Sequence, residues 1–146
     1  MALQRTPHWA TREFHSFLLE SASKSFAWGT NDCCMFPANA IKAFTGIDIA
    51  EDFRGKYTDQ DSAFALIKTI TGGTTVADAA AYCATKHGLS EYEHPLKAKR
   101  GDLVVVANGD NLIAGIVHLN GRHVVTVSEA GLVRLPITSI RCSWSI

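Results

Sequence analysis

The sequence has 146 residues and a balanced charge, with 14 lysines and arginines against 14 aspartates and glutamates. This balance argues against a role that depends on bulk charge, such as binding nucleic acid or a membrane surface. Apolar residues make up 47% of the chain and charged residues 19%, a composition that favours one globular domain over residues 1–146.

The first predicted helix lies close to the N-terminus. Thr6 is its expected cap, and Pro7 stands at its first position, where a proline costs no hydrogen bond. Apolar side chains then recur at helical spacing, at Trp9, Phe14, Phe17, Leu18 and Ala22. This spacing predicts one buried stripe along the helix.

A second helix is predicted after the segment FAWGTNDCCMF, residues 26–36. Asn31 or Asp32 is its expected cap. Pro37 removes a backbone hydrogen bond to the carbonyl of Cys33, so we expect the start of this helix to be kinked or loosely wound.

Two further helices are predicted before residue 90. The first is capped by Thr58 with Asp61 at its third position, and the second by Thr75 with Asp78 at its third position. Cys83 falls on the apolar stripe of the second of these helices. We therefore interpret Cys83 as a buried core residue.

From Arg100 onward the hydrophobic period changes. Five short strands are predicted, at residues 103–107, 112–119, 123–127, 132–135 and 142–146. Asn120-Gly121 predicts a tight type I′ hairpin, in which His118 would pair with His123. Helices followed by a meander of strands predict an α+β domain, with N-terminal helices packed on a C-terminal antiparallel sheet.

Cys33 is the residue at which the sequence indicates possible chemistry. A thiol in the first turn of a helix lies in the field of unpaired amides, which favours the thiolate. A cysteine peptidase also needs a histidine that holds the thiolate and protonates the leaving group, and a third group that orients the histidine. The alternative is a packed core cysteine, which is the usual role of a lone cysteine on a helix.

Several short motifs resemble one superfamily. They are FAWG at residues 26–29, DC at 32–33, RGDLV at 100–104 and GI at 115–116, and together they are similar to the NlpC-type cysteine peptidases. That superfamily has a papain-like fold and cleaves peptide bonds in cell-wall peptidoglycan. The resemblance implies a papain-like fold for this chain, and it implies that RGD begins a strand and is not a cell-adhesion signal.

Nearly the whole chain also resembles a group of small proteins from the tail modules of tailed phages and prophages. The shared pattern includes F-x-W-G-x-x-D-C-C, FRGKY at residues 53–57, RGDLV and the terminal WSI at 144–146. This resemblance implies a structural component of a phage tail tip or baseplate, made in the host cytoplasm and located in the virion. The implied partners are other tail proteins, including a hub protein that several copies would contact. An assembly chaperone absent from the finished particle is a further alternative.

The catalytic pattern of the superfamily is broken in this sequence. Active members carry His-x-Gly-Ile where this chain has Ile113-Ala114-Gly115-Ile116, and their orienting polar residue aligns with Val125. Neither aliphatic side chain can transfer a proton, so the resemblance implies a pseudoenzyme. We expect Cys33 to face the sheet near Ile113, where burial should outweigh the helix field and leave the thiol unreactive.

An active peptidase is the alternative function. It would cleave peptidoglycan stem peptides during phage DNA delivery, with Cys33 as the nucleophile and His118 or His123 as a relocated base. The odd spacing from Ile113 puts His118 on the opposite face of a regular strand. The two histidines could instead share a metal ion, but a solvated surface pair is the commoner arrangement.

The segment Phe53-Arg54-Gly55-Lys56-Tyr57 is the predicted partner contact. It combines aromatic and arginine anchors outside a regular helix or strand, and the alternative is a loop packed on its own domain. We expect no cofactor, no metal and no nucleic-acid partner. We also expect no membrane insertion, because no apolar run approaches the ~20 residues of a spanning helix and the N-terminus lacks the apolar core of a signal peptide.

Overall fold

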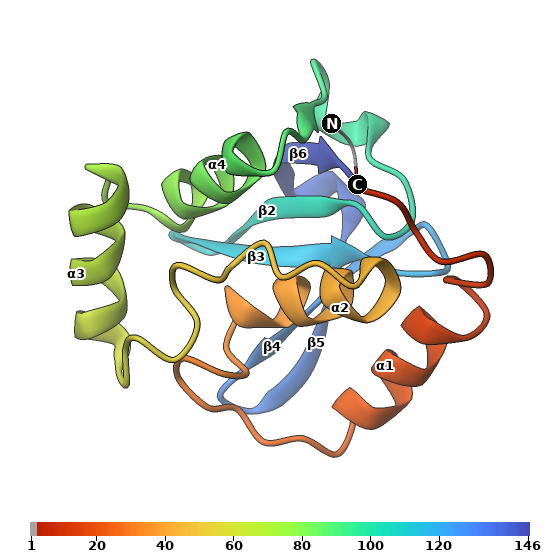
Figure 1. The fold of residues 1–146 in the computed structure, drawn as a ribbon, viewed down its shortest axis with the longest axis horizontal. Coiled ribbons are helices and arrows are strands. Elements are labelled where there is room, and N and C mark those ends of the chain that lie inside the picture. The colour runs from red at the N-terminus through yellow and green to blue at the C-terminus, as the bar shows by residue number, and fades with distance from the viewer. Residues whose placement is uncertain (1–2) are drawn as a thin grey trace.

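The computed structural model of the protein describes residues 3–146. Within these residues, four α-helices precede six strands (Figure 1). The helices are α1 (Glu13–Ser21), α2 (Met35–Thr45), α3 (Gln60–Thr71) and α4 (Val76–Lys86), and short 3₁₀ helices occur at η1 (Pro95–Lys97) and η2 (Ile137–Ser139). The strands are β1 (Ser90–Glu91), β2 (Leu103–Asn108), β3 (Asn111–Val117), β4 (His123–Ser128), β5 (Gly131–Pro136) and β6 (Ile140–Ser145).

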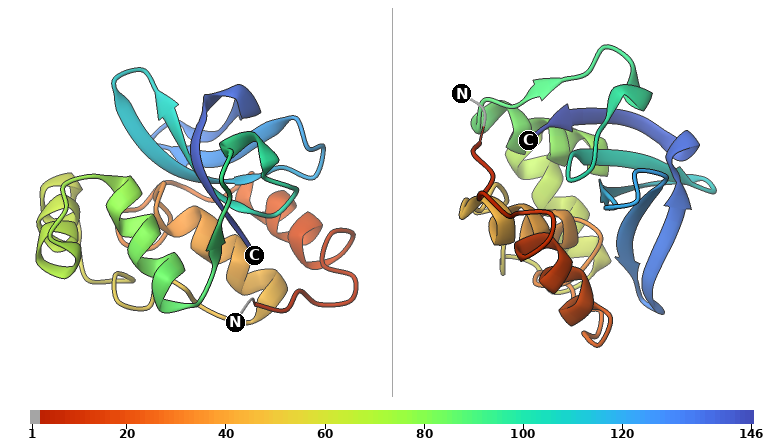
Figure 2. Two further views of the ribbon diagram at one scale, coloured as in Figure 1. Left: turned by 90° about the horizontal axis from the view of Figure 1, so that it is seen from above. Right: turned by 90° about the vertical axis from the view of Figure 1, so that its right-hand side faces the viewer.

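The strands form one sheet in the order β1-β6-β2-β3-β4-β5, in which every neighbouring pair is antiparallel. The helices cover one face of this sheet, as two further views show (Figure 2). α3 lies at the side of the molecule and packs on α4. The predicted α+β class, with N-terminal helices on a C-terminal antiparallel sheet, is confirmed. No helix within residues 3–146 combines the length and the hydrophobicity needed to cross a bilayer.

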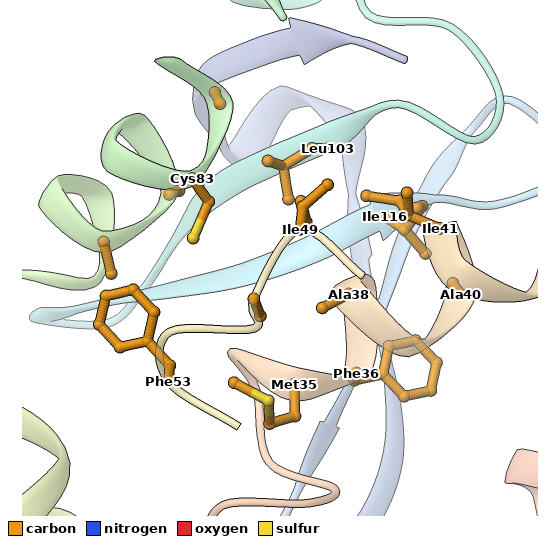
Figure 3. Close-up of a cluster of buried hydrophobic side chains, with 14 of the residues drawn as sticks. Met35, Phe36, Ala38, Ala40, Ile41, Ile49, Phe53, Cys83, Leu103 and Ile116 are labelled. Carbon is orange, nitrogen blue, oxygen red and sulfur yellow. The ribbon is translucent and has the colours of Figure 1, made fainter. Parts of the chain in front are cut away.

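The main core lies between the helices and the sheet (Figure 3). Leu103 and Ile116 point from the sheet into this core, and Cys83 enters it from α4 with 6% of its surface exposed. The prediction that Cys83 is a buried core residue is therefore confirmed. Alternate strand residues form a second apolar cluster on the opposite face of the sheet, at Val104, Val106, Val117, Val124 and Ile140.

β3 and β4 pair over only part of their length. The paired residues are Ile116 with Val125 and Val117 with Val124, whereas β2 and β3 pair along the whole of β2. Regular backbone pairing between the two strands therefore ends at Ile116, although the hydroxyl of Thr126 in β4 still donates to the carbonyl of Ala114 in β3 at 2.7 Å. β3 also packs on α2, and its residues Asn111, Leu112 and Ile113 line the site described below.

Asp102 ties the ends of the chain to the sheet. Its carboxylate is 1% exposed and lies 2.9 Å from the Arg5 guanidinium. It also accepts hydrogen bonds from the Tyr92 hydroxyl at 2.7 Å and from the amides of Lys99 and Ile146 at 2.8 and 3.1 Å. The RGD sequence therefore leads directly into β2 with a buried aspartate, as the resemblance implied.

α1 begins later than the sequence predicted. Residues 7–12 form successive turns, and regular helix starts at Glu13. The hydroxyl of Thr6 does not cap a helix, because it is buried without a hydrogen-bond partner. The amide of Thr6 instead donates to the carbonyl of Phe44 at 2.8 Å. This contact with α2 fixes the position of the chain before α1. A capping pattern read from neighbouring residues cannot predict it, because Phe44 is distant in the sequence.

The caps of α3 and α4 show how closely a local pattern can locate a helix start. α4 begins after Thr75 with a capping box to Asp78, as predicted. α3 is capped by Asp59, which forms its capping box with Ser62, and not by Thr58. The predicted cap was wrong by one residue because both neighbouring side chains are good caps.

The hairpin at Asn120-Gly121 is wider than predicted. The amide of Gly121 donates to the carbonyl of His118 at 2.9 Å, and the amide of His118 donates to the carbonyl of His123 at 2.8 Å. A type I′ turn needs positive φ at both central residues, and among the described residues only glycines have positive φ. The predicted turn type is therefore wrong, while the pairing of His118 with His123 is confirmed.

Arg5→Met is expected to lower the free energy of unfolding by about 3 kcal/mol, because it leaves the buried Asp102 carboxylate without its cation. Arg12→Met is the matched control, since the Arg12 side chain is 71% exposed and lies 3.5 Å from Glu13. Its effect should stay within about 0.5 kcal/mol. Urea titration of both variants measures the difference, and equal effects would contradict the role given to Asp102.

Candidate functional site

Cys33 lies in the first turn of α2. Regular helix begins at Met35, but the amide of Phe36 already donates to the carbonyl of Asp32 at 2.8 Å. Asp32 is therefore the capping residue, and Cys33 is the first residue after the cap. Cys34 has helical backbone angles, but Pro37 has no amide hydrogen to donate to the carbonyl of Cys33, so the regular hydrogen-bond pattern begins only at Met35.

Asp32 is the centre of a closed hydrogen-bond network. Asp32 is buried, with 1% of its surface exposed. One carboxylate oxygen, Oδ1, accepts from the amides of Cys34 and Met35, both at 2.9 Å. The other, Oδ2, accepts from the amide of Gly29 at 2.7 Å and from the hydroxyl of Tyr57 at 2.6 Å. Four donors thus satisfy a buried carboxylate and hold three segments of the chain together.

Gly29 permits the closest approach in this network. Its φ is +86°, and a Cβ at this position would lie 2.5 Å from the carbonyl oxygen of Tyr57. The carbonyl of Gly29 also accepts a hydrogen bond from the amide of Gly55 at 3.0 Å. No other residue type fits both the conformation and the space. The Trp28-Gly29 turn is therefore built against the segment that contains Gly55 and Tyr57.

The segment of residues 53–57 is packed on its own domain. Phe53 and Tyr57 are each 5% exposed, and Phe53 lies at the border of the main core (Figure 3). Arg54 donates to Asp48 at 2.7 Å and to Asn39 at 2.6 Å. The prediction that Phe53 and Tyr57 are exposed anchors for a partner is wrong, because the core and the Asp32 network bury both aromatic rings. The Arg54 side chain is 27% exposed, so its role as a contact stays a prediction. The role of Tyr57 was missed, since 25 residues separate it from Asp32.

Cys33 and Cys34 are neighbouring thiols, and each affects the pKa of the other. The thiol of Cys34 donates to the sulfur of Cys33, which lowers the pKa of Cys33 and raises the pKa of Cys34 well above its usual range. Burial and the nearby Asp32 carboxylate act against the Cys33 thiolate, whereas the backbone amide of Ala114 favours it. The pKa of Cys33 is lowered overall, chiefly by the Cys34 thiol, which is opposite to the direction expected from burial. The low reactivity expected for this thiol stays a prediction.

The other two cysteines are poorer nucleophiles than Cys33. Burial raises the pKa of Cys83 to about 12 and the pKa of Cys142 to about 11. All four cysteines are free thiols. Because the thiolate is the reactive form of cysteine, Cys33 is the thiol most ready to react at neutral pH.

Cys33 opens onto a cleft of about 400 Å³ between the Trp28-Gly29 turn, α3 and the β2–β3 hairpin. The apolar part of its wall is formed by Trp28, Ala63, Phe64, Ile67, Val76, Leu112 and Ile113. The polar part is formed by Gln60, Thr74, Thr75, Asp110 and Asn111. No histidine of the described chain lines this cleft. Cys34 lines the cleft beside Cys33. The cleft therefore offers two adjacent thiols and space for a small molecule, but no histidine.

The two positions expected to be degenerate lie on opposite faces of the sheet. Ile113 lines the Cys33 cleft and also packs against the second apolar cluster. Val125 is 2% exposed and belongs to the main core, opposite Ile116. The structure thus brings Ile113 to the Cys33 cleft as expected, but it does not bring Ile113 and Val125 together in one site.

His118 and His123 lie away from Cys33. His118 follows Ala114 by four residues, a distance of about 13 Å along an extended strand, and it lines a separate cleft of about 600 Å³ beside α1. The Nδ1 atom of His118 accepts from the amide of Asn120 at 3.0 Å, and the side chain of Asn120 contacts His123 at 3.0 Å. Neither histidine is placed to serve Cys33. No group of three His, Cys, Asp or Glu side chains suited to a metal ion occurs in residues 3–146.

Asp32→Asn is expected to lower the free energy of unfolding by about 2 kcal/mol, because the new amide group would face the Gly29 amide and leave a buried donor unsatisfied. Asp59→Asn is the matched control, since Asp59 caps α3 at an exposed position and asparagine caps helices as well as aspartate does. The Asp59 variant should change stability by a few tenths of a kcal/mol. Chemical denaturation measures both, and equal losses would show that the Asp32 network is an ordinary cap.

The chain was compared with protein families, curated proteins and solved structures. A family model described as "Domain of unknown function (DUF6950)" matches residues 4–146. No curated protein and no solved structure matches the chain. The family match spans the Asp32 network, the Cys33 cleft and the whole sheet, and the chain therefore belongs to the DUF6950 family.

Proposed function

We propose that this protein is a non-catalytic NlpC-like domain that serves as a structural component of a phage tail tip or baseplate. The non-catalytic assignment rests on one observation: no histidine is found among the described residues that line the cleft beside Cys33. A peptide bond releases an amine, which a cysteine peptidase must protonate through its histidine. Ile113 occupies the wall of the cleft and cannot supply this proton.

The papain-like assignment is supported by the arrangement around the thiol. Cys33 begins a helix that packs on an antiparallel sheet, and the backbone of Ala114 in β3 approaches the Cys33 sulfur. This arrangement agrees with the superfamily that the sequence motifs resemble. A domain that keeps such a fold without its proton-transfer group is suited to binding or assembly, because function depends on the site and not on the fold.

The tail role rests on the resemblance of nearly the whole chain to tail-module proteins. Under this proposal the partners are other tail proteins, including a hub protein contacted by several copies, and the protein is located in the virion. Phe53 and Tyr57 are buried and do not supply the aromatic anchors of the contact surface, whereas Arg54 is partly exposed. Large apolar side chains are exposed elsewhere on the protein, for example Leu19 at 65% and Phe64 at 38%.

A peptidase that uses Cys33 is the second candidate function. The lowered pKa of Cys33 and the cleft beside it favour this alternative, because both are features of a nucleophile. Its base would have to be His118 or His123 after a rearrangement of the β3–β4 hairpin. The positions of these side chains beside Asn120 argue against it.

The purified protein is expected to show no turnover of peptidoglycan or its stem peptides. Loss of general acid–base catalysis alone slows such a reaction typically by ~10²–10⁴-fold. Release of peptides is followed by mass spectrometry, with Cys33→Ala as the background control. Turnover that disappears in Cys33→Ala would establish the peptidase, and further loss in His118→Ala or His123→Ala would identify its base.

Phage that carry Cys33→Ala are expected to form complete tails and normal plaques, whereas phage that lack the protein should form incomplete tails. Electron microscopy of the particles and mass spectrometry of purified tails measure the two effects. Complete tails that bind cells but fail to deliver DNA after Cys33→Ala would indicate an enzyme. Incomplete tails without the protein, combined with its absence from finished wild-type tails, would indicate an assembly chaperone.

A further inference from the structure

Thiol exchange at Cys33 does not need the histidine that peptide cleavage needs. An amine leaving group must be protonated as it departs, but a thiolate is a weaker base and leaves a disulfide without a proton donor. The requirements for exchange are an accessible thiolate and room for the disulfide that it attacks. Cys33 is half-buried and lines a cleft of about 400 Å³, and its pKa is lowered. Cys34 lines the same cleft, but its pKa is raised.

We propose that Cys33 is a site of reversible mixed-disulfide formation with a small thiol that is held in the adjoining cleft. The Cys33 thiolate attacks one sulfur of a small disulfide R–S–S–R. The new Cys33–S–S–R bond forms as the original S–S bond breaks, and R–S⁻ departs and takes a proton from water. The small disulfide is itself the oxidant, so the exchange needs no other reactant. This inference goes beyond the proposed function and does not rest on it.

The local structure directs the exchange to one of the four cysteines. The Cys34 thiol and the Ala114 backbone stabilise negative charge on the Cys33 sulfur. The pKa values of Cys34, Cys83 and Cys142 are all raised, which leaves little thiolate at these positions at neutral pH. Modification is therefore expected at Cys33 alone.

The position of Cys34 makes the mixed disulfide long-lived. In many thiol proteins a second cysteine attacks the mixed disulfide and expels the small thiol. Here the second thiol is the immediate neighbour in the chain, where a disulfide to Cys33 forms only with severe strain. The raised pKa of Cys34 also keeps it protonated. An external thiol is therefore needed to release the bound group.

The charge of the cleft favours one class of small thiol. Asp110, at the tip of the β2–β3 hairpin, is the only charged side chain that lines the cleft, and no lysine or arginine of the described chain lines it. Aromatic walls at Trp28 and Phe64 can cover an aliphatic stem. A volume of about 400 Å³ lies within the ~300–1,000 Å³ typical of small-molecule sites. The fitting ligand is an amphipathic thiol with a neutral or cationic end, such as an aminothiol, and not an anionic one.

The test uses the full-length protein with three small disulfides at pH 7: cystamine, which is cationic, hydroxyethyl disulfide, which is neutral, and oxidised glutathione, which is anionic. Intact-mass spectrometry and peptide mapping should show one adduct per chain on Cys33, formed fastest with cystamine and reversed by added thiol. Cys33→Ser should abolish the adduct, and Cys142→Ser should leave it unchanged. Adducts spread over several cysteines, or a Cys33 that reacts only after unfolding, would overturn the proposal.

Asp110→Asn separates recognition by the cleft from the general attraction between a thiolate and a cation. Asp110 is exposed in a hairpin turn, so the variant should fold normally, which circular dichroism checks. The ratio of the cystamine rate to the glutathione rate should fall by about threefold, as expected for loss of one exposed charge contact. An unchanged ratio would remove the cleft from the proposal, and formation of a Cys33–Cys34 disulfide in place of the adduct would overturn the role given to Cys34.

Discussion

The buried carboxylate of Asp32 receives four hydrogen bonds, and the rest of the site depends on this arrangement. Two of the donors belong to the start of α2, one to the Trp28-Gly29 turn and one to Tyr57. A buried carboxylate without such donors would be strongly destabilising, so the three segments must meet in this geometry whenever the protein is folded. The position of Cys33 follows from it, because Cys33 is the residue directly after the cap.

The same network explains why Cys33 can be ionised beside a negative charge. Asp32 opposes the thiolate, but its charge is already shared among four donors, and the Cys34 thiol and the Ala114 backbone act on the Cys33 sulfur directly. Ala114 lies in β3, which packs on α2 while its carbonyl accepts a hydrogen bond from Thr126 in β4. Groups from the start of α2 and from β3 thus both lower the pKa of Cys33. A second buried carboxylate, Asp102, has an equivalent structural role at the chain ends.

The absence of a histidine from the described residues that line the cleft restricts the chemistry of this site without removing it. A cysteine peptidase protonates the leaving amine through a histidine, and no histidine of the described chain lines the cleft beside Cys33. Exchange between thiols and disulfides has no such requirement. A domain whose proposed role is structural can therefore have a reactive thiol. The cleft beside Cys33 provides the space in which a small molecule could meet this thiol. The two proposals are independent, because one concerns assembly and the other a modification of one side chain.

Local patterns in the sequence predicted the four helices and the strands β2 to β6, because hydrophobic period and capping chemistry act between residues a few positions apart. β1, only two residues long at Ser90–Glu91, was not predicted. The capping box of α4 and the buried stripe that contains Cys83 were correct for this reason. The contact between Tyr57 and Asp32 spans 25 residues and has no local pattern. An FRGKY segment that looked suited to a partner was therefore found packed on its own domain. The distance of His118 from Cys33 and the lowered pKa of Cys33 likewise arise from where β3 passes the start of α2, which only the tertiary structure decided because hydrogen bonds and burial depend on neighbours in space.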